Sequence, residues 1–527
     1  MFLTIKPMRK LYSVFLLPFF IASVGCAPTP DVVSGNEVKD DHWPKAGITY
    51  EIFVQSFYDT DGDGIGDING VTKKLDHVKN LNANAIWFMP IMPSPSYHKY
   101  DVTDYKEIHP DYGTLEDFKK LIEEAHRKDI RIVIDMIINH TSSEHPWFLE
   151  AKKGPDNPFR DYYVWAGKDT IADHINKKQT TLDSDNIRQW HDPGHGDEFY
   201  YGFFTGNMPD LNFDNPKVRE EIYEIGRFWL EEMGVDGFRL DAAKHIYPDD
   251  RPEDNHAFWV EFREEMEKIK PDVYLVGEVY DMKEVVAPYL PGLPALFNFD
   301  FHYTLLESFE KGEGMLLAER QKEILDYYYD ITDDFIDATF SSNHDQPRLL
   351  SSLKGNEAKA RQAIVILMTM PGAPYLYYGE EIGMLGEKPD EHIREPFLWD
   401  VEENDTGRAT WIEPKFSTDD TVIPLVKQKD DPESKFNFYK EITSLRANDR
   451  VLTLGSLELT DLELNKTVMG YERHHNGEVY KVFHNIGDAE VEFDLDDQDY
   501  EVVYKHGNVD VKNGKISLAA YESVVIK

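Results

Sequence analysis

Cysteine is nearly absent from this chain of 527 residues: Cys26 is the only one, so no disulfide within the chain can stabilise the fold. Basic residues are also scarce, with 56 Lys and Arg against 98 Asp and Glu, which gives a formal net charge of −42. Such an acidic surface repels nucleic acid and anionic lipid and argues against both as partners. Two interpretations of the acidity stay open, adaptation to high salt and an ordinary acidic exported protein.

Apolar runs long enough to cross a membrane are lacking as well. The run from Leu11 to Val24 is too short for a span, but it follows Met8-Arg9-Lys10 and suits the core of an export signal. It ends in "ASVGC", which resembles the bacterial box at which a lipoprotein is cleaved and its cysteine lipidated. We therefore predict a signal peptide over 1–26, lipidation of Cys26 at the cell surface and a tether over 27–41. The alternative is an ordinary cleaved secretory signal.

From about residue 46 onward, short apolar runs alternate with amphipathic helical patterns. In "VREEIYEIGRFWLEEM" the apolar positions at helical spacing are Val218, Ile222, Ile225, Trp229 and Met233. Eight strand patterns that alternate with helices predict a parallel sheet, and their number favours a (β/α)8 barrel. A doubly wound sheet is the competing topology.

The spacing of these patterns predicts the domain organisation. The connection after the third strand is far too long for a simple loop, so we expect a small inserted domain there. Beyond the last helical pattern, short alternating runs predict an all-β sandwich. The expected parts are a first barrel segment at 42–140, the insertion at 141–215, a second barrel segment at 216–450 and the C-terminal β domain at 451–527.

Charged residues stand at the ends of several predicted strands, where a barrel of this type places its chemistry. "GFRLDAAKH" contains Arg239 and Asp241, which share one face because a strand alternates its faces. "VYLVGEVY" carries Glu278 after its apolar run, and "SSNHD" contains Asp345. A single strand-end carboxylate is usually a structural ion pair. Three such carboxylates at one barrel mouth indicate a catalytic site.

Paired carboxylates at a barrel mouth suit the hydrolysis of glycosidic bonds. Arg239 is expected to keep Asp241 ionised, which makes Asp241 the nucleophile. Glu278 lies in an apolar strand with no adjacent cation, so burial should raise its pKa as a general acid requires. Asp345 can stabilise positive charge on the sugar ring.

With these residues identified, the chain resembles the α-amylase family of retaining glycoside hydrolases. "DMIINH", "GFRLDAAKH", "GEV" and "SSNHD" match its four strand-end motifs in order, and "MPDLNF" matches a fifth near the end of the insertion. The resemblance implies Asp241 as nucleophile, Glu278 as acid/base and Asp345 as transition-state stabiliser. It further implies a set of residues that bind the sugar at the cleaved bond: Tyr100, His140, Arg239 and His344.

A calcium site is predicted in "DTDGDGIGD", where carboxylates alternate and Gly64 stands sixth, as at the start of an EF-hand loop. Position twelve is Gly70, not glutamate, so the EF-hand pattern is incomplete. The stretch resembles a calcium loop in oligo-1,6-glucosidases of the family. That resemblance implies, as ligands, Asp59, Asp61, Asp63, Asp67 and the Ile65 carbonyl. A plain acidic turn is the alternative. A second calcium near Asn139 is common in α-amylases, but the sequence does not identify its ligands from the insertion.

Specificity is indicated by the residues that follow the nucleophile. The resemblance implies that Lys244 and His245 contact the leaving-side sugars of α-1,4-glucans. A small residue at the position of Ala242 is typical of family members that act on α-1,4 bonds. "YHKYDVTDY" resembles the amylase form of its motif, with Lys99 in place of glycine. The Asp59 loop, "NHTSSEHPWF" and "NHDQPR" are closer to the α-glucosidase branch. The sequence therefore predicts an intermediate group between oligo-1,6-glucosidases and neopullulanases.

The leading hypothesis is an exported, monomeric, calcium-binding α-amylase that cleaves internal α-1,4 bonds of starch and maltodextrins. The alternatives within the family are an exo-acting α-glucosidase or oligo-1,6-glucosidase and a neopullulanase or cyclomaltodextrinase. An inactive relative that binds sugar or a transporter is the alternative from another class. The presence of all three carboxylates and Arg239 argues against it.

Overall fold

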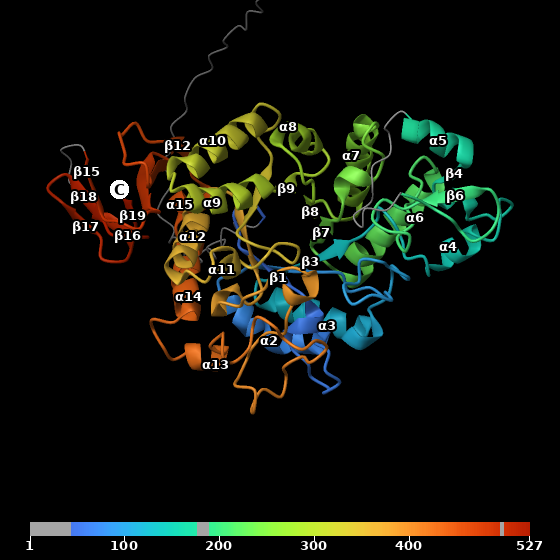
Figure 1. Ribbon diagram of the computed structural model, residues 1–527, viewed down its shortest axis with the longest axis horizontal. Coiled ribbons are helices and arrows are strands. Elements are labelled where there is room, and N and C mark those ends of the chain that lie inside the picture. The colour runs from blue at the N-terminus through green and yellow to red at the C-terminus, as the bar shows by residue number, and fades with distance from the viewer. Residues whose placement is uncertain (1–43, 177–188, 496–499) are drawn as a thin grey trace, which may run out of the picture. The chain divides into compact units, whose positions relative to one another are not determined.

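Eight short strands close into a parallel barrel at the centre of the computed structural model, which describes residues 44–176, 189–495 and 500–527 (Figure 1). The strands are almost wholly buried, as their apolar sequences predict. Because β1 pairs with β11, the sheet has no edge; this confirms the predicted barrel and rules out a doubly wound sheet. The barrel strands are β1 (Thr49–Ile52), β2 (Ala85–Phe88), β3 (Arg131–Met136), β7 (Gly237–Leu240), β8 (Tyr274–Gly277), β9 (Ala295–Phe297), β10 (Ile336–Phe340) and β11 (Ala373–Tyr377).

Amphipathic helices lie around the barrel (Figure 1). The Thr114 hydroxyl and the Asp117 carboxylate form a capping box at the start of α3, whose buried face carries Phe118 and Leu121. The longer helices are α2 (Ile68–Asn80), α3 (Leu115–Arg127), α6 (Pro216–Arg227), α7 (Pro252–Ile269), α9 (Phe299–Lys311), α10 (Met315–Tyr329), α12 (Glu357–Thr369) and α14 (Lys435–Asn448). Short helices are α1 (Val54–Phe57), α8 (Lys283–Val286), α11 (Leu349–Ser352), α13 (Leu425–Gln428), α15 (Arg450–Leu454), η1 (Pro110–Tyr112), η4 (Ala243–His245), η5 (Ala287–Tyr289), η6 (Glu380–Ile382) and η7 (Asp390–His392).

The helix predicted from Val218 to Met233 changes its winding partway. It is α-helical to Arg227 and continues as the wider π-type turn η3 (Phe228–Met233), which ends at Gly234 with φ +88°. The five apolar residues at helical spacing are all buried against the barrel, as their pattern predicts.

The long connection between β3 and α6 holds a small sheet in the order β4-β6-β5. An aromatic cluster supports it: the Phe148 ring lies 4.9 Å from Tyr200 and is stacked 6.1 Å from Trp165. Its elements are α4 (Pro146–Ala151), η2 (Arg160–Tyr162), β4 (Trp165–Gly167), α5 (Lys168–Asn176), β5 (Trp190–His191) and β6 (Glu198–Tyr201).

The described residues from Ser456 onward form only β-strands and turns, as predicted, although the expected start of this part at residue 451 lies in helix α15. A five-stranded sheet in the order β12-β13-β14-β19-β16 and a three-stranded sheet in the order β15-β18-β17 share one apolar core. The Gln362 amide of α12 donates to the carbonyls of Asn485 and Glu522 and so joins this part to the barrel helices. The strands are β12 (Ser456–Leu459), β13 (Val468–His475), β14 (Glu478–Asn485), β15 (Val491–Asp494), β16 (Val502–His506), β17 (Asp510–Lys512), β18 (Lys515–Leu518) and β19 (Ser523–Ile526).

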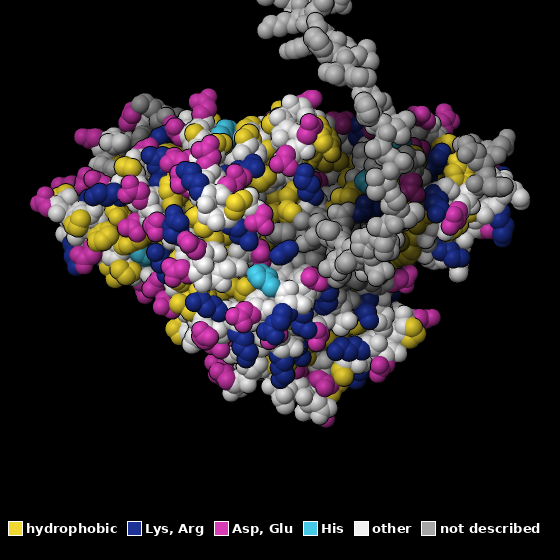
Figure 2. Space-filling view, turned by 180° about the vertical axis from the view of Figure 1, so that it is seen from behind, with side chains coloured by type: hydrophobic (Ala, Val, Ile, Leu, Met, Phe, Trp, Pro, Cys, Tyr) yellow, Lys and Arg dark blue, Asp and Glu magenta, His cyan; other side chains and the backbone are white. Residues whose placement is uncertain are grey.

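Acidic side chains are spread over the face shown in Figure 2, with Lys and Arg between them. Within the described ranges, no helix combines the length and the apolar character that a membrane span needs. The predicted signal peptide, the tether and Cys26 lie outside the described residues.

Candidate active site

The loops at the carboxyl ends of the barrel strands surround an open cleft of about 360 Å³. This size is ordinary for a ligand site, and the lining mixes aromatic rings with charged groups. All three predicted catalytic carboxylates line it, one residue or a few residues beyond β7, β8 and β10. The lining residues are Tyr97, His98, Tyr100, His140, Phe204, Thr205, Met208, Asp241, Glu278, Asp345, Asp390 and Arg394.

Arg239 is the centre of the polar network beneath the cleft. Its side chain is buried, and its Nη1 donates to Asp135 at 2.9 Å and to Asp241 at 2.6 Å. Its Nη2 lies 2.9 Å from Oε2 of Glu278. One guanidinium therefore links carboxylates from three neighbouring strands, β3, β7 and β8.

One expectation about these charges was wrong, and another was incomplete because it left out burial. Glu278 does have an adjacent cation, because the long Arg239 side chain reaches across from β7 to β8. Burial raises the pKa of Asp241, and Arg239 only partly opposes that rise. Burial likewise raises the pKa of Glu278, as predicted, and raises that of Asp135 to about 7. Arg239 contacts both carboxylates, so its proximity does not by itself distinguish the charge of Asp241 from that of Glu278.

Asp345 has a different environment from the other two carboxylates. Its side chain is 40% exposed to the cleft, with Oδ2 at 3.1 Å from Nε2 of His344 and Oδ1 at 2.8 Å from Arg394. Burial opposes its ionisation, but His344, and after it Arg394, outweigh that effect and hold the pKa of Asp345 below its usual range. Asp345 is therefore a permanent negative charge at the cleft.

His344 is held between two acids. Its Nδ1 lies 2.5 Å from Glu51 of β1, and its Nε2 contacts Asp345 and the Tyr100 hydroxyl at 3.1 and 2.7 Å. Burial disfavours the imidazolium, but Asp345 and Glu51 together raise the pKa of His344 to about 10. His344 is thus a cation at neutral pH.

Tyr100 and His140 complete the polar wall of the cleft. The Tyr100 hydroxyl donates to Asp135 at 3.2 Å, and its ring is stacked 5.7 Å from His344. Burial lowers the pKa of His140 to about 4, so its ring is neutral. Nε2 of His140 donates to the Tyr100 carbonyl at 3.1 Å, which makes Nδ1 an acceptor. Within the described ranges this buried Nδ1 has no hydrogen-bond partner and is available to a ligand hydroxyl.

The backbone turns sharply where Asp241 leaves β7. Ala242 has the left-handed φ of +47°, and its N–H donates to Oε2 of Glu278 at 3.1 Å. The next amide, of Ala243, donates to the Glu278 carbonyl at 3.1 Å. This turn fixes Asp241 and Glu278 relative to each other through the main chain.

Lys244 and His245 lie on η4, beside the cleft but not among the residues that line it. The Lys244 ammonium donates to Asp281 at 2.9 Å. The His245 ring is stacked 4.0 Å from Phe203 of the insertion. In the described structure these contacts occupy the two side chains that the resemblance assigns to leaving-side sugars.

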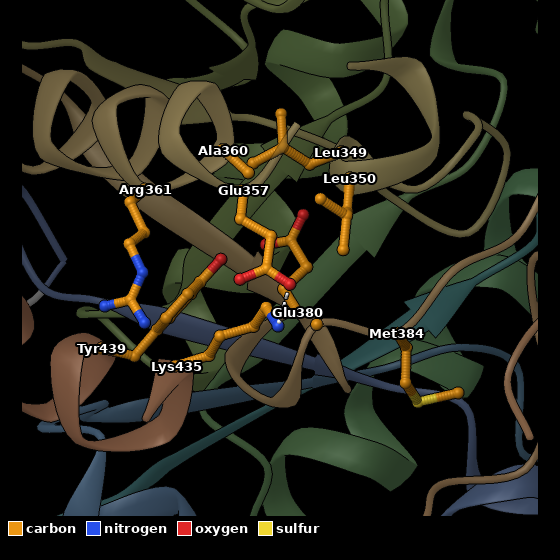
Figure 3. Close-up of a pocket in the computed structure, with 10 residues that line it drawn as sticks. Leu349, Leu350, Glu357, Ala360, Arg361, Glu380, Met384, Lys435 and Tyr439 are labelled. Atoms are coloured by element: carbon orange, nitrogen blue, oxygen red, sulfur yellow. Dashed lines mark hydrogen bonds and ion pairs between the residues drawn. The ribbon is translucent and has the colours of Figure 1, made fainter. Parts of the chain in front are cut away.

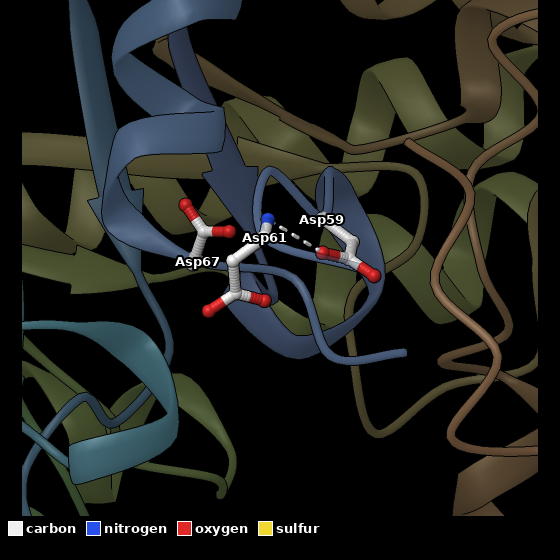
Figure 4. A group of neighbouring side chains, drawn as sticks. All are labelled: Asp59, Asp61 and Asp67. Atoms are coloured by element: carbon white, nitrogen blue, oxygen red, sulfur yellow. Dashed lines mark hydrogen bonds between the residues drawn. The ribbon is translucent and has the colours of Figure 1, made fainter. Parts of the chain in front are cut away.

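Three acids of the predicted calcium loop lie together (Figure 4). One carboxylate oxygen from each of Asp59, Asp61 and Asp67 lies within 4.8 Å of the others. Asp63 is not in this group; it is exposed, and its Oδ1 accepts from the Ile65 amide at 2.8 Å. The Asp59 carboxylate accepts from the Gly62 and Gly64 amides, which closes the loop.

A second cavity lies between α11, α12, η6 and α14, and Figure 3 shows the residues around it. It contains the buried Glu380, whose pKa burial raises to about 8, and an ion pair of 2.8 Å between Lys435 and Glu357. Its volume of about 20 Å³ is enough for a water molecule but not for a sugar. None of the predicted site residues lines it, so the cleft is the candidate site.

Sequence reasoning missed several residues that hold the site. Arg394, in "HIREP" after β11, contacts Asp345, but it lies outside the strand-end motifs. Glu51 looked like one polar residue in an apolar strand, although a buried acid in a barrel strand is itself a signal. Phe204 and Thr205 come from the insertion and carried no signal, whereas Met208 is the first residue of the "MPDLNF" motif.

Comparison with known proteins agrees with this geometry. Residues 51–455 match the family described as alpha amylase, catalytic domain, and residues 468–525 match the alpha-amylase SusG C-terminal domain. The chain is 42% identical over 521 residues to alpha-amylase 3 of Dictyoglomus thermophilum, covering 98% of both proteins. It is 35% identical over 451 residues to a 4-alpha-glucanotransferase of Thermotoga neapolitana, covering 85% of this chain and 97% of that one. The solved alpha-amylase from H. orenii matches with a TM-score of 0.84 and 40% identity, over 92% of this chain and 99% of that chain.

The catalytic-domain match spans residues 51–455, well over half of the chain, and the expected carboxylates meet at the mouth of the barrel. The chain therefore belongs to the α-amylase family of glycoside hydrolases and acts on α-glucans.

Proposed function

We propose that the protein is an endo-acting α-amylase that hydrolyses internal α-1,4 bonds of starch and maltodextrins with retention. The observation that carries this proposal is the convergence of Asp241, Glu278 and Asp345 on one open cleft. Retaining enzymes need their nucleophile and acid close together, at about 5–5.5 Å. The Arg239 guanidinium, which contacts both carboxylates, supports such a short separation.

In this proposal Asp241 attacks the anomeric carbon while Glu278 protonates the glycosidic oxygen, so the bond to the leaving sugar breaks and a glycosyl ester forms on Asp241. Glu278 then takes a proton from water, which attacks the same carbon and releases Asp241. Arg239 and the Ala242 amide both contact Oε2 of Glu278, so we expect Oε1 to carry the transferred proton. Arg239 donates to Oδ1 of Asp241, which leaves Oδ2 for the attack.

The remaining residues bind and polarise the sugar. Asp345, kept ionised by His344 and Arg394, faces the cleft where positive charge develops on the ring. Nδ1 of His140, which has no partner among the described residues, is a buried acceptor for a ring hydroxyl. The Tyr100 ring, stacked on His344, offers an aromatic face to the same sugar.

The rival within the family is an exo-acting α-glucosidase. Incubation with a maltoheptaose blocked at its non-reducing end separates the two, because an endo-acting enzyme cleaves it and an exo-acting enzyme cannot.

Asp241→Asn should abolish hydrolysis and keep the melting temperature close to that of the wild type. Full activity of that variant would refute the mechanism, and failure to cut the blocked substrate would refute endo action.

We also propose that the loop from Asp59 to Asp67 binds Ca²⁺. The donors are hard oxygens, which calcium prefers, and two of the three acids that lie together, Asp59 and Asp67, are buried. The Asp63 carboxylate and the Ile65 carbonyl are the further predicted ligands. Bound calcium would neutralise these charges and tie the loop that follows β1 to the start of α2.

Chelation followed by thermal unfolding tests this calcium site. We expect EDTA to lower the melting temperature of the wild type and added Ca²⁺ to restore it. Asp61→Asn should reduce that dependence, whereas Asp330→Asn, at an exposed aspartate after α10, should retain it. A wild type whose melting temperature does not respond to calcium contradicts the proposal.

A second calcium is proposed between the barrel and the insertion. Oδ1 of Asn139 is buried and has no partner in the part of the chain that the structure describes. Its Nδ2 faces Oδ2 of Asp210 and the His245 carbonyl, both at 3.3 Å. Turning the Asn139 amide over would place its oxygen toward the Asp210 carboxylate and the His245 carbonyl, and these three oxygen types are suitable calcium donors. Calcium titration of Asp210→Asn by calorimetry should show one site fewer than the wild type.

Export and lipid anchoring at Cys26 are proposed from the sequence alone. The apolar run, the small residues before Cys26 and the lack of any other cysteine support it. Cys26→Ser should move the protein from the membrane fraction to the soluble fraction of a bacterial expression host. Equal distribution of the two forms contradicts lipidation.

A further inference from the structure

The interior of the barrel contains a buried acid that the proposed mechanism does not use. Glu51 of β1 is 1% exposed. Its neighbour Tyr50 packs on His77 of α2, with the rings 6.0 Å apart, so Glu51 on the opposite face of the strand points into the barrel. A carboxylate is seldom buried without a partner, because the loss of its hydration is costly. Glu51 therefore needs a cation or a strong donor beside it.

The partner of Glu51 is the ring of His344, which is also buried. Oε1 of Glu51 lies 2.5 Å from Nδ1 of His344, and Nε2 on the other side of the ring lies 3.1 Å from Oδ2 of Asp345. The His344 carbonyl accepts from Nε of Arg394 at 3.0 Å, which holds the main chain of this residue. The three side chains Glu51, His344 and Asp345 therefore form a line that starts inside the barrel and ends at the cleft.

The two acids determine where the hydrogens of the His344 ring lie. An ionised carboxylate only accepts hydrogen bonds, so Glu51 requires a hydrogen on Nδ1 and Asp345 requires one on Nε2. A neutral imidazole carries only one of these hydrogens, whereas an imidazolium carries both. A glutamine in place of Glu51 could accept the same hydrogen bond without adding a charge. What the glutamate adds is electrostatic stabilisation of the imidazolium.

The surroundings of His344 favour its charged form through the acids that contact the ring. Burial disfavours the imidazolium, but Asp345 and, after it, Glu51 outweigh burial and raise the pKa of His344 to about 10. The Tyr100 hydroxyl lies 2.7 Å from Nε2, and the Arg394 guanidinium is paired with Asp345 at 2.8 Å. The other charged groups around the ring are Asp135 of β3, Arg239 of β7 and Asp241.

We propose that Glu51 is a positioning residue: it holds His344 in its charged form, and His344 in turn keeps the side chains of the cleft in the orientation that binds the sugar. The inference rests on the proposed function and deepens it. His344 does not line the cleft, so it acts on the sugar through Asp345 and Tyr100, which do. With a hydrogen on Nε2, His344 donates to Asp345 and to the Tyr100 oxygen, and the Tyr100 hydroxyl is left to donate to Asp135 at 3.2 Å.

Loss of the Nε2 hydrogen would change both contacts. A bare Nε2 would repel the Asp345 carboxylate, because both would then present only lone pairs. The Tyr100 hydroxyl would turn to donate to Nε2 and leave Asp135. Glu51 therefore affects the cleft although it is buried inside the barrel and touches no sugar.

The first measurement follows the protonation of His344 in the full-length enzyme. NMR of protein labelled with nitrogen-15 at histidine distinguishes an imidazolium from a neutral ring, and comparison with His344→Gln identifies the signals of His344. We expect both ring nitrogens of the wild type to keep their hydrogens between about pH 6 and 9. In Glu51→Gln one of two negative charges is removed, so the pKa of His344 should fall from about 10 toward its ordinary value of about 6.5, and the ring should become neutral within that range.

The second measurement is kcat/KM on maltoheptaose over the same pH range. Glu278 titrates in both enzymes, so dividing the value of the variant by that of the wild type removes its contribution. For Glu51→Gln we expect this ratio to fall about tenfold as pH rises, which corresponds to about 1.4 kcal/mol. Glu51→Asp keeps a negative charge in the barrel and should restore most of the ratio at high pH.

Asp337→Asn is the matched control. Asp337 is a buried acid of another barrel strand, β10, but its carboxylate accepts from the amides of Asn298 and Gln321, so its ratio should not depend on pH. A constant ratio in a folded Glu51→Gln enzyme overturns the proposal. So does a wild type in which His344 loses its proton below about pH 8, a result that needs no variant of Glu51 to fold. A wild type that does not cleave maltoheptaose refutes the proposed function instead, and the NMR titration then still tests the effect of Glu51 on His344.

Discussion

Replacing Arg239 with lysine tests the electrostatic centre of the site. In the wild type, Nη1 contacts Asp135 and Asp241 and Nη2 contacts Glu278, at 2.6 to 2.9 Å. A lysine keeps the positive charge, but its single ammonium group cannot span all three carboxylates. We therefore expect Arg239→Lys to lose its contact with Asp241, which stands one residue beyond β7.

The size of the effect follows from the lost hydrogen bond. A hydrogen bond to a charged group contributes about 1.5–3 kcal/mol. One pKa unit corresponds to about 1.4 kcal/mol, so the pKa of Asp241, already raised by burial, should rise by a further one to two units, roughly. Because the ionised form attacks, activity is present above this pKa and lost as pH falls through it. The acid limb of kcat/KM should therefore move to higher pH by the same amount.

The assay is the pH profile of kcat/KM on maltoheptaose, with the melting temperature measured to show that the variant is folded. Arg394→Lys is the matched control. It loses contacts with Asp345, whose pKa lies far below the assay range, so its acid limb should stay in place even if the rate falls. A folded Arg239→Lys enzyme with an unshifted acid limb refutes the assigned role of Arg239.

Three further predictions concern stability. Gly237→Ala places a Cβ 2.0 Å from the Tyr274 carbonyl in the neighbouring strand, so chemical denaturation should show a loss of about 1–3 kcal/mol. Ala242 has a left-handed φ, so Ala242→Gly should raise, and Ala242→Val lower, the free energy of unfolding by about 1 kcal/mol. Because the pKa of His344 is higher in the folded chain than in the unfolded chain, protonation of His344 stabilises the fold. This stabilisation is fully present below the unfolded pKa of about 6.5 and is lost as pH rises through about 10. His344→Gln should flatten that decline, and an equal decline in the variant contradicts the assignment.

Much of the fold could be predicted because its signals are local. Each barrel strand is a short apolar run, and helices such as α3 carry both an apolar stripe and a cap in their own sequence. The number of such units then favours a barrel, since parallel strands with covering helices on one side close on themselves. The change from α6 to the π-type turn η3 was not predictable, because both windings bury Trp229 and Met233.

The site was predictable where residues lie near one another in sequence. Arg239 and Asp241 share a strand face, and their contact follows from the two-residue period of the strand. The contact of Arg239 with Glu278 was missed, because it depends on a side chain that crosses between adjacent strands. The contact of His344 with Glu51 joins residues 293 positions apart, which no local pattern reveals.

The sequence by itself determined the parts: eight strands, the residues at their ends, the long insertion and the C-terminal sheets. Closure of the barrel decided which charges meet, because it brings the ends of β1, β7, β8 and β10 to one mouth. It also decided the direction of the pKa shift of Asp241, since burial and neighbouring charge act in opposite directions and only the folded distances show which is larger.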